Sequence, residues 1–113
     1  MISFVAGADR TGLRLVLLQD SNVISQEYIA SSPIHRNERR IIEVFLESAH
    51  ESWGGIDRFV VLQLPHSHTS VRVMRSLLSV AAWYYGQPMH SIACEQLAQY
   101  PAEQLTSHLA DLE

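Results

Sequence analysis

The chain has 113 residues, 47% of them hydrophobic and 18% charged, which suits one globular domain with a single core. Its formal net charge is -4, and no block of basic residues would follow a nucleic-acid backbone, so direct nucleic-acid binding is not expected. A lone cysteine excludes an internal disulfide, and no apolar stretch is long enough for a membrane span, so we expect a cytoplasmic protein without membrane attachment.

Three strands are expected at the start of the chain. Residues 2–6 and 13–18 are apolar runs separated by a glycine-containing turn. A cluster of turn-forming residues, 19–22, precedes a third strand over 23–29. These segments predict an antiparallel three-stranded meander.

A helix is expected over residues 34–53, between the break at Pro33 and a pair of glycines. Its core-facing stripe has the spacing i, i+3, i+4 and consists of Ile42, Phe45, Leu46, Ala49 and Trp53. Ile41 and Val44 form a second flank that is less polar than a solvated helix requires.

A buried strand over 56–64 and a strongly apolar helix over 70–85 follow. The strand shows no alternation, which is typical of a strand covered on both faces. The helix has only a narrow polar stripe, made of Arg72, Arg75, Ser76 and Ser79. Such a helix is either sandwiched inside its own domain or covered by a partner, and the small size of the domain favours a partner surface.

A last strand is expected over 89–93, followed by a short helix over 94–99 and a final amphipathic helix with Leu105, Leu109 and Leu112. The element order β-β-β-α-β-α-β-α predicts an α/β fold with a mixed five-stranded sheet. This is the topology of the ribonuclease-H-like lobe of actin-like ATPases.

The turn over residues 62–72 joins the buried strand to the apolar helix, where α/β proteins usually bind their ligands. It contains no glycine, although a phosphate-binding loop needs close approach of its backbone. Pro65 also removes a backbone donor, and His66 and His68 add bulk. The position favours a nucleotide site, whereas the residues argue against one.

Several motifs resemble those of the TsaB (YeaZ) family, the bacterial accessory subunit in the synthesis of threonylcarbamoyladenosine in tRNA. The family's turn G-R-G-P-G-S-F-T-G-x-R matches residues 62–72 at four positions, and other residues replace every glycine. Residues 6–11, 35–39 and 91–98 resemble the family's L-D-T-S, H-x-E-R and G-V-S-S-L-E-A-L-A segments. The degenerate loop positions are Pro65, His66, Ser67, His68, Thr69 and Arg72.

The resemblance implies a single TsaB-like N-terminal lobe over residues 1–113, without the second lobe of the family. It implies a non-catalytic protein that supports threonylcarbamoyl transfer to tRNA adenosine through a TsaD-like partner. No cofactor is expected, and the first two helices would form a homodimer or a heterodimer with the partner. The interface candidates are Ile41, Val44, Phe45, Met74, Leu78, Ala81, Ala82 and Tyr85. Leu78→Glu is therefore expected to weaken association and leave the domain folded.

Other interpretations remain open. A nucleotide-binding protein or an enzyme would use the altered turn from Pro65 to Arg72, and a paralogue would keep the dimer surface in an unrelated role. His66-x-His68 supplies two metal ligands without an identifiable third, so no metal site is expected. Asp9 is either the remnant of a phosphate- or magnesium-binding acid or a turn-forming residue. Cys94 is expected to be a buried small residue.

Overall fold

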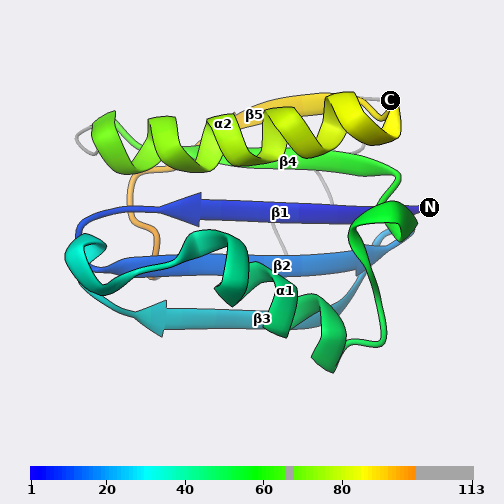
Figure 1. Cartoon of the computed structure of the whole chain (residues 1–113), viewed down its shortest axis with the longest axis horizontal. Helices are drawn as coiled ribbons and strands as arrows, with labels where there is room; N and C mark the ends of the chain where they lie inside the picture. The colour runs from blue at the N-terminus through cyan, green and yellow to red at the C-terminus, as the bar shows by residue number, and fades with distance from the viewer. Residues whose placement is uncertain (66–67, 99–113) are drawn as a thin grey trace.

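A mixed five-stranded sheet forms the centre of the protein in a computed structural model (Figure 1). The structure describes residues 1–65 and 68–98. The expected antiparallel meander is confirmed as β1 (Ile2–Ala8), β2 (Gly12–Gln19) and β3 (Asn22–Ala30).

The remaining two strands are parallel to β1 and complete the sheet. β4 (Arg58–Gln63) pairs with β1, and β5 (Met89–Ala93) pairs with β4, which gives the strand order β3-β2-β1-β4-β5. The predicted α/β class and mixed sheet are therefore confirmed, because β1 pairs antiparallel with β2 and parallel with β4.

Two helices cover the same face of the sheet, α1 (Glu38–Ser48) and α2 (His68–Tyr85) (Figure 1). Their buried side chains share one core with the side chains of β1, β2 and β4, including the fully buried Phe4 and Phe59. Among the described residues, neither helix is long and apolar enough to cross a lipid bilayer.

The opposite face of the sheet is also buried. Val5, Val60 and Leu62 belong to a second apolar cluster that includes Leu97, which follows β5. A Cβ atom on Gly7 would lie 2.7 Å from Cβ of Leu62 and 2.6 Å from Cδ1 of Leu97, so a glycine at this position leaves room for both leucines. Burial on both faces explains the uninterrupted apolar run of β4.

The first helix is shorter than the predicted span of 34–53. The side chain of Asn37 accepts a hydrogen bond from the backbone N–H of Arg40 at 3.1 Å and caps α1 at its N-terminus. His50 adopts a left-handed conformation with φ of 57°, just after the helix ends. Short 3-10 helices, Pro33–His35 and Trp53–Gly55, occupy the predicted ends instead.

The segment after β5 differs from the prediction. Residues 94–98 do not form the expected short helix, because they run across the second face of the sheet and bury Leu97 and Cys94. The predicted final helix lies outside the described residues.

Four of the predicted interface residues belong to the core of the domain. Phe45, Met74, Leu78 and Ala82 are at most 4% exposed and pack between the helices and the sheet. They cannot meet a partner in the folded domain, which corrects their assignment to the interface. The sequence showed an apolar helix but did not indicate which side of it faces the sheet.

Leu78→Glu is now expected to unfold the domain rather than to weaken association. The substitution removes a fully buried side chain and places a carboxylate among apolar neighbours. A loss of more than about 3 kcal/mol in the free energy of unfolding is expected, by analogy with large-to-small core substitutions. Urea denaturation measures it. Ser79→Glu, at an exposed position of the same helix, is the matched control and should cost less than about 0.5 kcal/mol; similar losses for both variants would contradict the assignment of Leu78 to the core.

Candidate functional site

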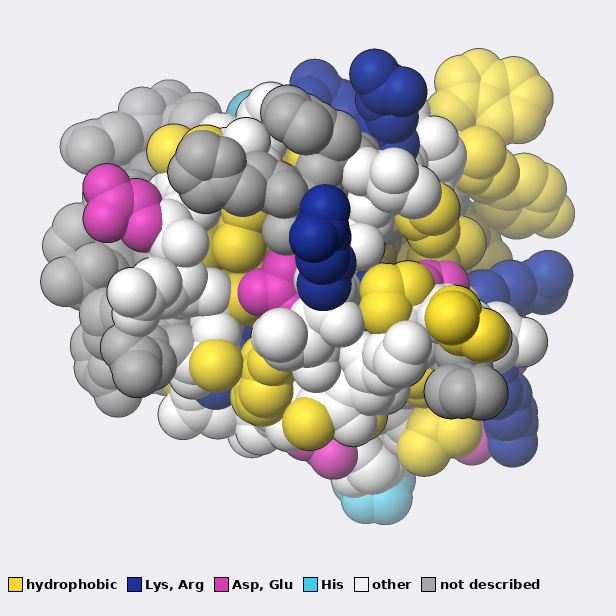
Figure 2. Space-filling view, turned by 90° about the vertical axis from the view of Figure 1, so that its left-hand side faces the viewer, with side chains coloured by type: hydrophobic (Ala, Val, Ile, Leu, Met, Phe, Trp, Pro, Cys, Tyr) yellow, Lys and Arg dark blue, Asp and Glu magenta, His cyan; other side chains and the backbone are white. Residues whose placement is uncertain are grey.

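The turn between β4 and α2 lies at the carboxyl edge of the parallel strands, where the sequence places it. β4 ends at Gln63, and α2 begins at His68. Pro65, Thr69 and Arg72 are exposed, whereas His66 and Ser67 lie outside the described residues. Figure 2 faces this edge and shows arginine side chains close to hydrophobic ones.

Asp9, at the same edge, acts as a turn-forming residue. Its Oδ1 accepts hydrogen bonds from the backbone N–H groups of Thr11 at 2.8 Å and Gly12 at 3.0 Å. It also accepts one from the Thr11 hydroxyl at 2.7 Å. Within the described part of the chain, no group of three or more His, Cys, Asp or Glu side chains could hold a metal ion.

A buried arginine, Arg36, joins this turn to both helices. Its side chain is 1% exposed, and its Nε lies 3.1 Å from the Glu38 carboxylate at the start of α1. One terminal nitrogen donates to the carbonyl oxygens of Asp9 at 2.6 Å and Gly12 at 3.0 Å. The other donates to the hydroxyl of Ser70 in the first turn of α2, at 3.3 Å. Arg36 therefore fixes the hairpin relative to the starts of both helices.

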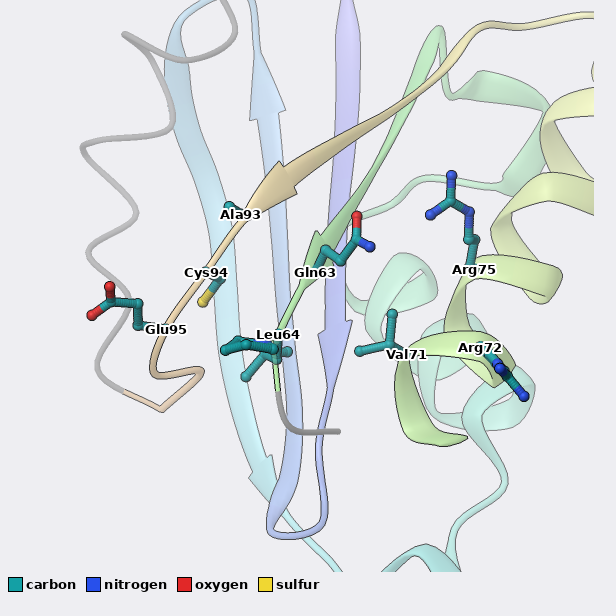
Figure 3. A pocket seen from close by; sticks show the side chains of 9 residues that line it. Gln63, Leu64, Val71, Arg72, Arg75, Ala93, Cys94 and Glu95 are labelled. Carbon is teal, nitrogen blue, oxygen red and sulfur yellow. The ribbon is translucent and has the colours of Figure 1, made fainter. Parts of the chain in front are cut away.

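A hollow of about 610 Å³ lies between the end of β4, the end of β5 and the first turns of α2 (Figure 3). Leu64 and Val71 are each 7% exposed and line it, together with Arg72 and Arg75. Cys94 lies on the β5 side and is 3% exposed, as expected for a buried small residue. Its burial is the main cause that raises the pKa of the Cys94 thiol above its ordinary value of 9.0, so the group is a neutral thiol.

The flank of α2 that faces α1 and the solvent is apolar. We call it the α2 flank, and it consists of Val73, Leu77, Val80, Ala81 and Tyr84. Val80 is 65% exposed and Tyr84 is 72% exposed. Leu77 and Ala81 are half-buried and line a shallow groove of about 280 Å³ with Arg39 of α1.

The remaining interface candidates lie at different depths around this flank. Tyr85 and Val44 are 40% and 48% exposed, whereas Ile41 is half-buried and packs against the core. The ring of Tyr85 meets that of Tyr84 edge to face, with centroids 4.8 Å apart. Ile41, Val44, Ala81 and Tyr85 therefore remain possible contacts, and the structure adds Val73, Val80, Tyr84 and the 81% exposed Trp83 to the surface.

Most of the α2 flank is visible in the sequence as a second apolar line along the helix. Val73, Leu77, Val80 and Tyr84 recur at i, i+4, i+7 and i+11, which marks one line along a helix. The core line of Met74, Leu78 and Ala82 has a similar spacing, i, i+4, i+8. The two lines differ only in which of them the sheet covers, so spacing alone could not separate core from surface.

Comparison with known proteins supports the fold. No family model matches this chain, and no curated protein does. YeaZ from Pseudomonas aeruginosa is similar in structure, with a TM-score of 0.71 at 14% identity over 81% of this chain and 42% of that chain. A structure described as an uncharacterized protein with similarity to peptidase YEAZ, also from P. aeruginosa, gives 0.69 at 15% identity over 81% of this chain and 43% of its own.

RuvC from T. thermophilus, in complex with a Holliday junction substrate, gives a TM-score of 0.56 at 18% identity over 82% of this chain and 64% of that chain. The fold is therefore of the ribonuclease H-like and actin-like type, as expected, and it is YeaZ-like. The chain spans less than half the length of the YeaZ structures, 42% and 43%.

Arg36→Gln should strongly destabilise the domain. The glutamine cannot replace the charge beside Glu38 or reach the hairpin carbonyls and Ser70 together. Breaking a buried ion pair costs about 3–5 kcal/mol, and urea denaturation measures the loss. Arg40→Gln is the control, because the Arg40 side chain is 65% exposed and 3.9 Å from Glu43; it should cost no more than about 1 kcal/mol. An Arg36 variant as stable as the Arg40 variant would contradict the proposed role of Arg36.

The Cys94 thiol should react slowly in the folded chain. Because its burial raises its pKa and blocks access, little thiolate forms near neutral pH. We expect alkylation by iodoacetamide at pH 8, followed by mass spectrometry, to be at least about tenfold slower in native than in denaturing buffer. Equal rates would show that Cys94 is accessible.

Proposed function

We propose that this chain is a non-catalytic interaction protein that associates through helix α2. The observation that carries the proposal is the α2 flank, where apolar side chains are exposed beside the core that the described residues form. Contiguous apolar surface of this kind is unfavourable in water and is typical of a protein contact.

The composition of the surface around α2 supports the same interpretation. Trp83, Tyr84 and Tyr85 place three adjacent aromatic residues at the C-terminal end of the helix. Aromatic and arginine side chains are enriched in the centres of protein interfaces, and Arg39 lies beside the groove. A second helix laid in the groove would cover Leu77 and Ala81 and place apolar side chains against Val80 and Tyr84.

The role we propose is like that of the TsaB subunit, which supports threonylcarbamoyl transfer to tRNA adenosine through a TsaD-like partner. The YeaZ-like fold and the spacing of Pro65, Thr69 and Arg72 support it. The partner would be a TsaD-like subunit or a second copy of this chain. In a pair of identical chains, the two α2 flanks would face each other about a two-fold axis.

Val80→Glu should weaken this association and leave the fold intact. The substitution places a charge in the proposed contact at a position that is 65% exposed in the isolated chain. We expect the dissociation constant of the homodimer, or of the complex with a purified TsaD-like subunit, to rise at least about tenfold. Analytical ultracentrifugation and isothermal titration calorimetry measure the two cases, and Ser79→Glu is the control on the polar side of the helix.

Two outcomes would overturn the proposal. One is a chain that stays monomeric and does not bind the TsaD-like subunit. The other is equal weakening by Val80→Glu and Ser79→Glu, since the contact would then lie elsewhere. Titration of ATP in the same calorimeter tests the competing class, and micromolar binding by the isolated chain would favour a nucleotide-binding protein.

A further inference from the structure

The hollow at the carboxyl edge is separate from the proposed association surface. It lies on the flank of α2 that carries Arg72 and Arg75, whereas Val73 and Val80 lie on the other flank. A ligand in the hollow would therefore not compete with a helix that packs against the α2 flank. Its volume of about 610 Å³ is within the usual range for small-molecule sites.

The lining of the hollow is positive, although the chain as a whole is acidic. Arg72 and Arg75 give +2 and Glu95 gives -1, so the lining has a formal charge of +1, against -4 for the whole chain. Within the described residues, the ion pairs found involve Arg36, Arg39, Arg40 and the N-terminus, not these two arginines.

The helix terminus beside the hollow adds to this positive potential. The N-terminal end of α2 carries a partial positive charge, and the first turn contains no acidic residue to offset it. Arginines in the following turns are placed at the less favourable end of the helix. Positive side chains near the positive end of a helix are locally unfavourable, and unfavourable placements of this kind are typical of functional sites.

The inner wall of the hollow is apolar. Leu64 and Val71 both line it, and Ala93 lies at the end of β5 (Figure 3). Gln63 and Arg75 also line the hollow, and in Figure 3 their polar groups are both drawn above Leu64 and Val71, whereas the Arg72 guanidinium points outward. The hollow thus combines an apolar wall with a polar and cationic side.

We propose that this hollow binds a small organic anion, a carboxylate or phosphate monoester attached to a compact apolar group. The Arg75 guanidinium and the Gln63 amide bind the oxygens of the head group, because a guanidinium presents paired N–H donors that match an oxyanion. The apolar group packs between Leu64 and Val71. Arg72 contributes charge at the entrance rather than a direct contact.

The test uses the full chain and four probes: hexanoate, phenyl phosphate, inorganic phosphate and neutral hexanol. Two-dimensional NMR follows the backbone amides of Leu64, Val71 and Ala93 during titration. We expect saturable shifts with hexanoate or phenyl phosphate, and the tighter-binding of the two is the preferred probe. Inorganic phosphate and hexanol should each bind at least about tenfold more weakly than that probe, because phosphate lacks the apolar group and hexanol lacks the negative charge.

Variants separate the charge from the apolar wall. Arg75→Gln should weaken binding of the preferred probe at least about tenfold, and Arg72→Gln should weaken it less. Ala93→Leu should also weaken it, because the larger side chain fills the hollow without a change of charge. Arg40→Gln, an exposed arginine on α1, is the matched control and should leave binding unchanged.

The proposal is overturned if neither organic anion shows saturable binding up to about 10 mM, the upper limit of a weak specific site. Hexanol binding as tightly as hexanoate would show an apolar site without anion recognition and would equally reject it. So would equal losses in Arg75→Gln and Arg40→Gln, which would indicate a general charge effect. A folded far-UV circular dichroism spectrum for each variant ensures that lost binding reports on the site.

Discussion

The arrangement of the two helices on the sheet depends on the buried guanidinium of Arg36, whose protein partners replace water as hydrogen-bond acceptors. The guanidinium of Arg36 is 1% exposed, and a charge at such a position is tolerated only when its donors are matched. Glu38 matches the charge, while the carbonyls of Asp9 and Gly12 and the Ser70 hydroxyl accept three further hydrogen bonds. These partners belong to the β1–β2 hairpin, α1 and α2. Arg36 therefore holds these three elements in position at the carboxyl edge of the sheet.

Helix α2 meets three environments around its circumference, and each has a different physical consequence. The line with Met74 and Leu78 provides the core, so changes there act on the stability of the domain. The α2 flank remains exposed although it is apolar, which favours association. The side with Arg72 and Arg75 borders the hollow, where positive charge meets an apolar wall. One helix can therefore serve association and ligand binding through surfaces that do not overlap.

Most of the fold could be predicted because its signals are local, whereas the site depends on contacts between distant residues. The three-stranded meander and the strand Met89–Ala93 follow from short apolar runs between turn residues. The bounds of α1 could not be predicted as well, because the Asn37 cap and the left-handed His50 override a longer helical pattern. Apart from Glu38, the partners of Arg36 lie 24, 27 and 34 residues away in the chain, so no local pattern identifies its role. Nor could spacing separate the core line of α2 from its exposed line, since both recur every three or four residues.

The turn between β4 and α2 contains no glycine, which limits how its backbone could bind an anion. A glycine-rich turn binds an anion through backbone N–H groups that approach it closely. In this chain the turn contains Leu64, which is 7% exposed, and Pro65, which has no backbone N–H to donate. Any recognition at this edge must therefore come from side chains, and those of Gln63 and Arg75 lie on one side of the hollow. The end of β4 and the start of α2 therefore fix the position of the proposed site, and its side chains would decide which ligand it binds.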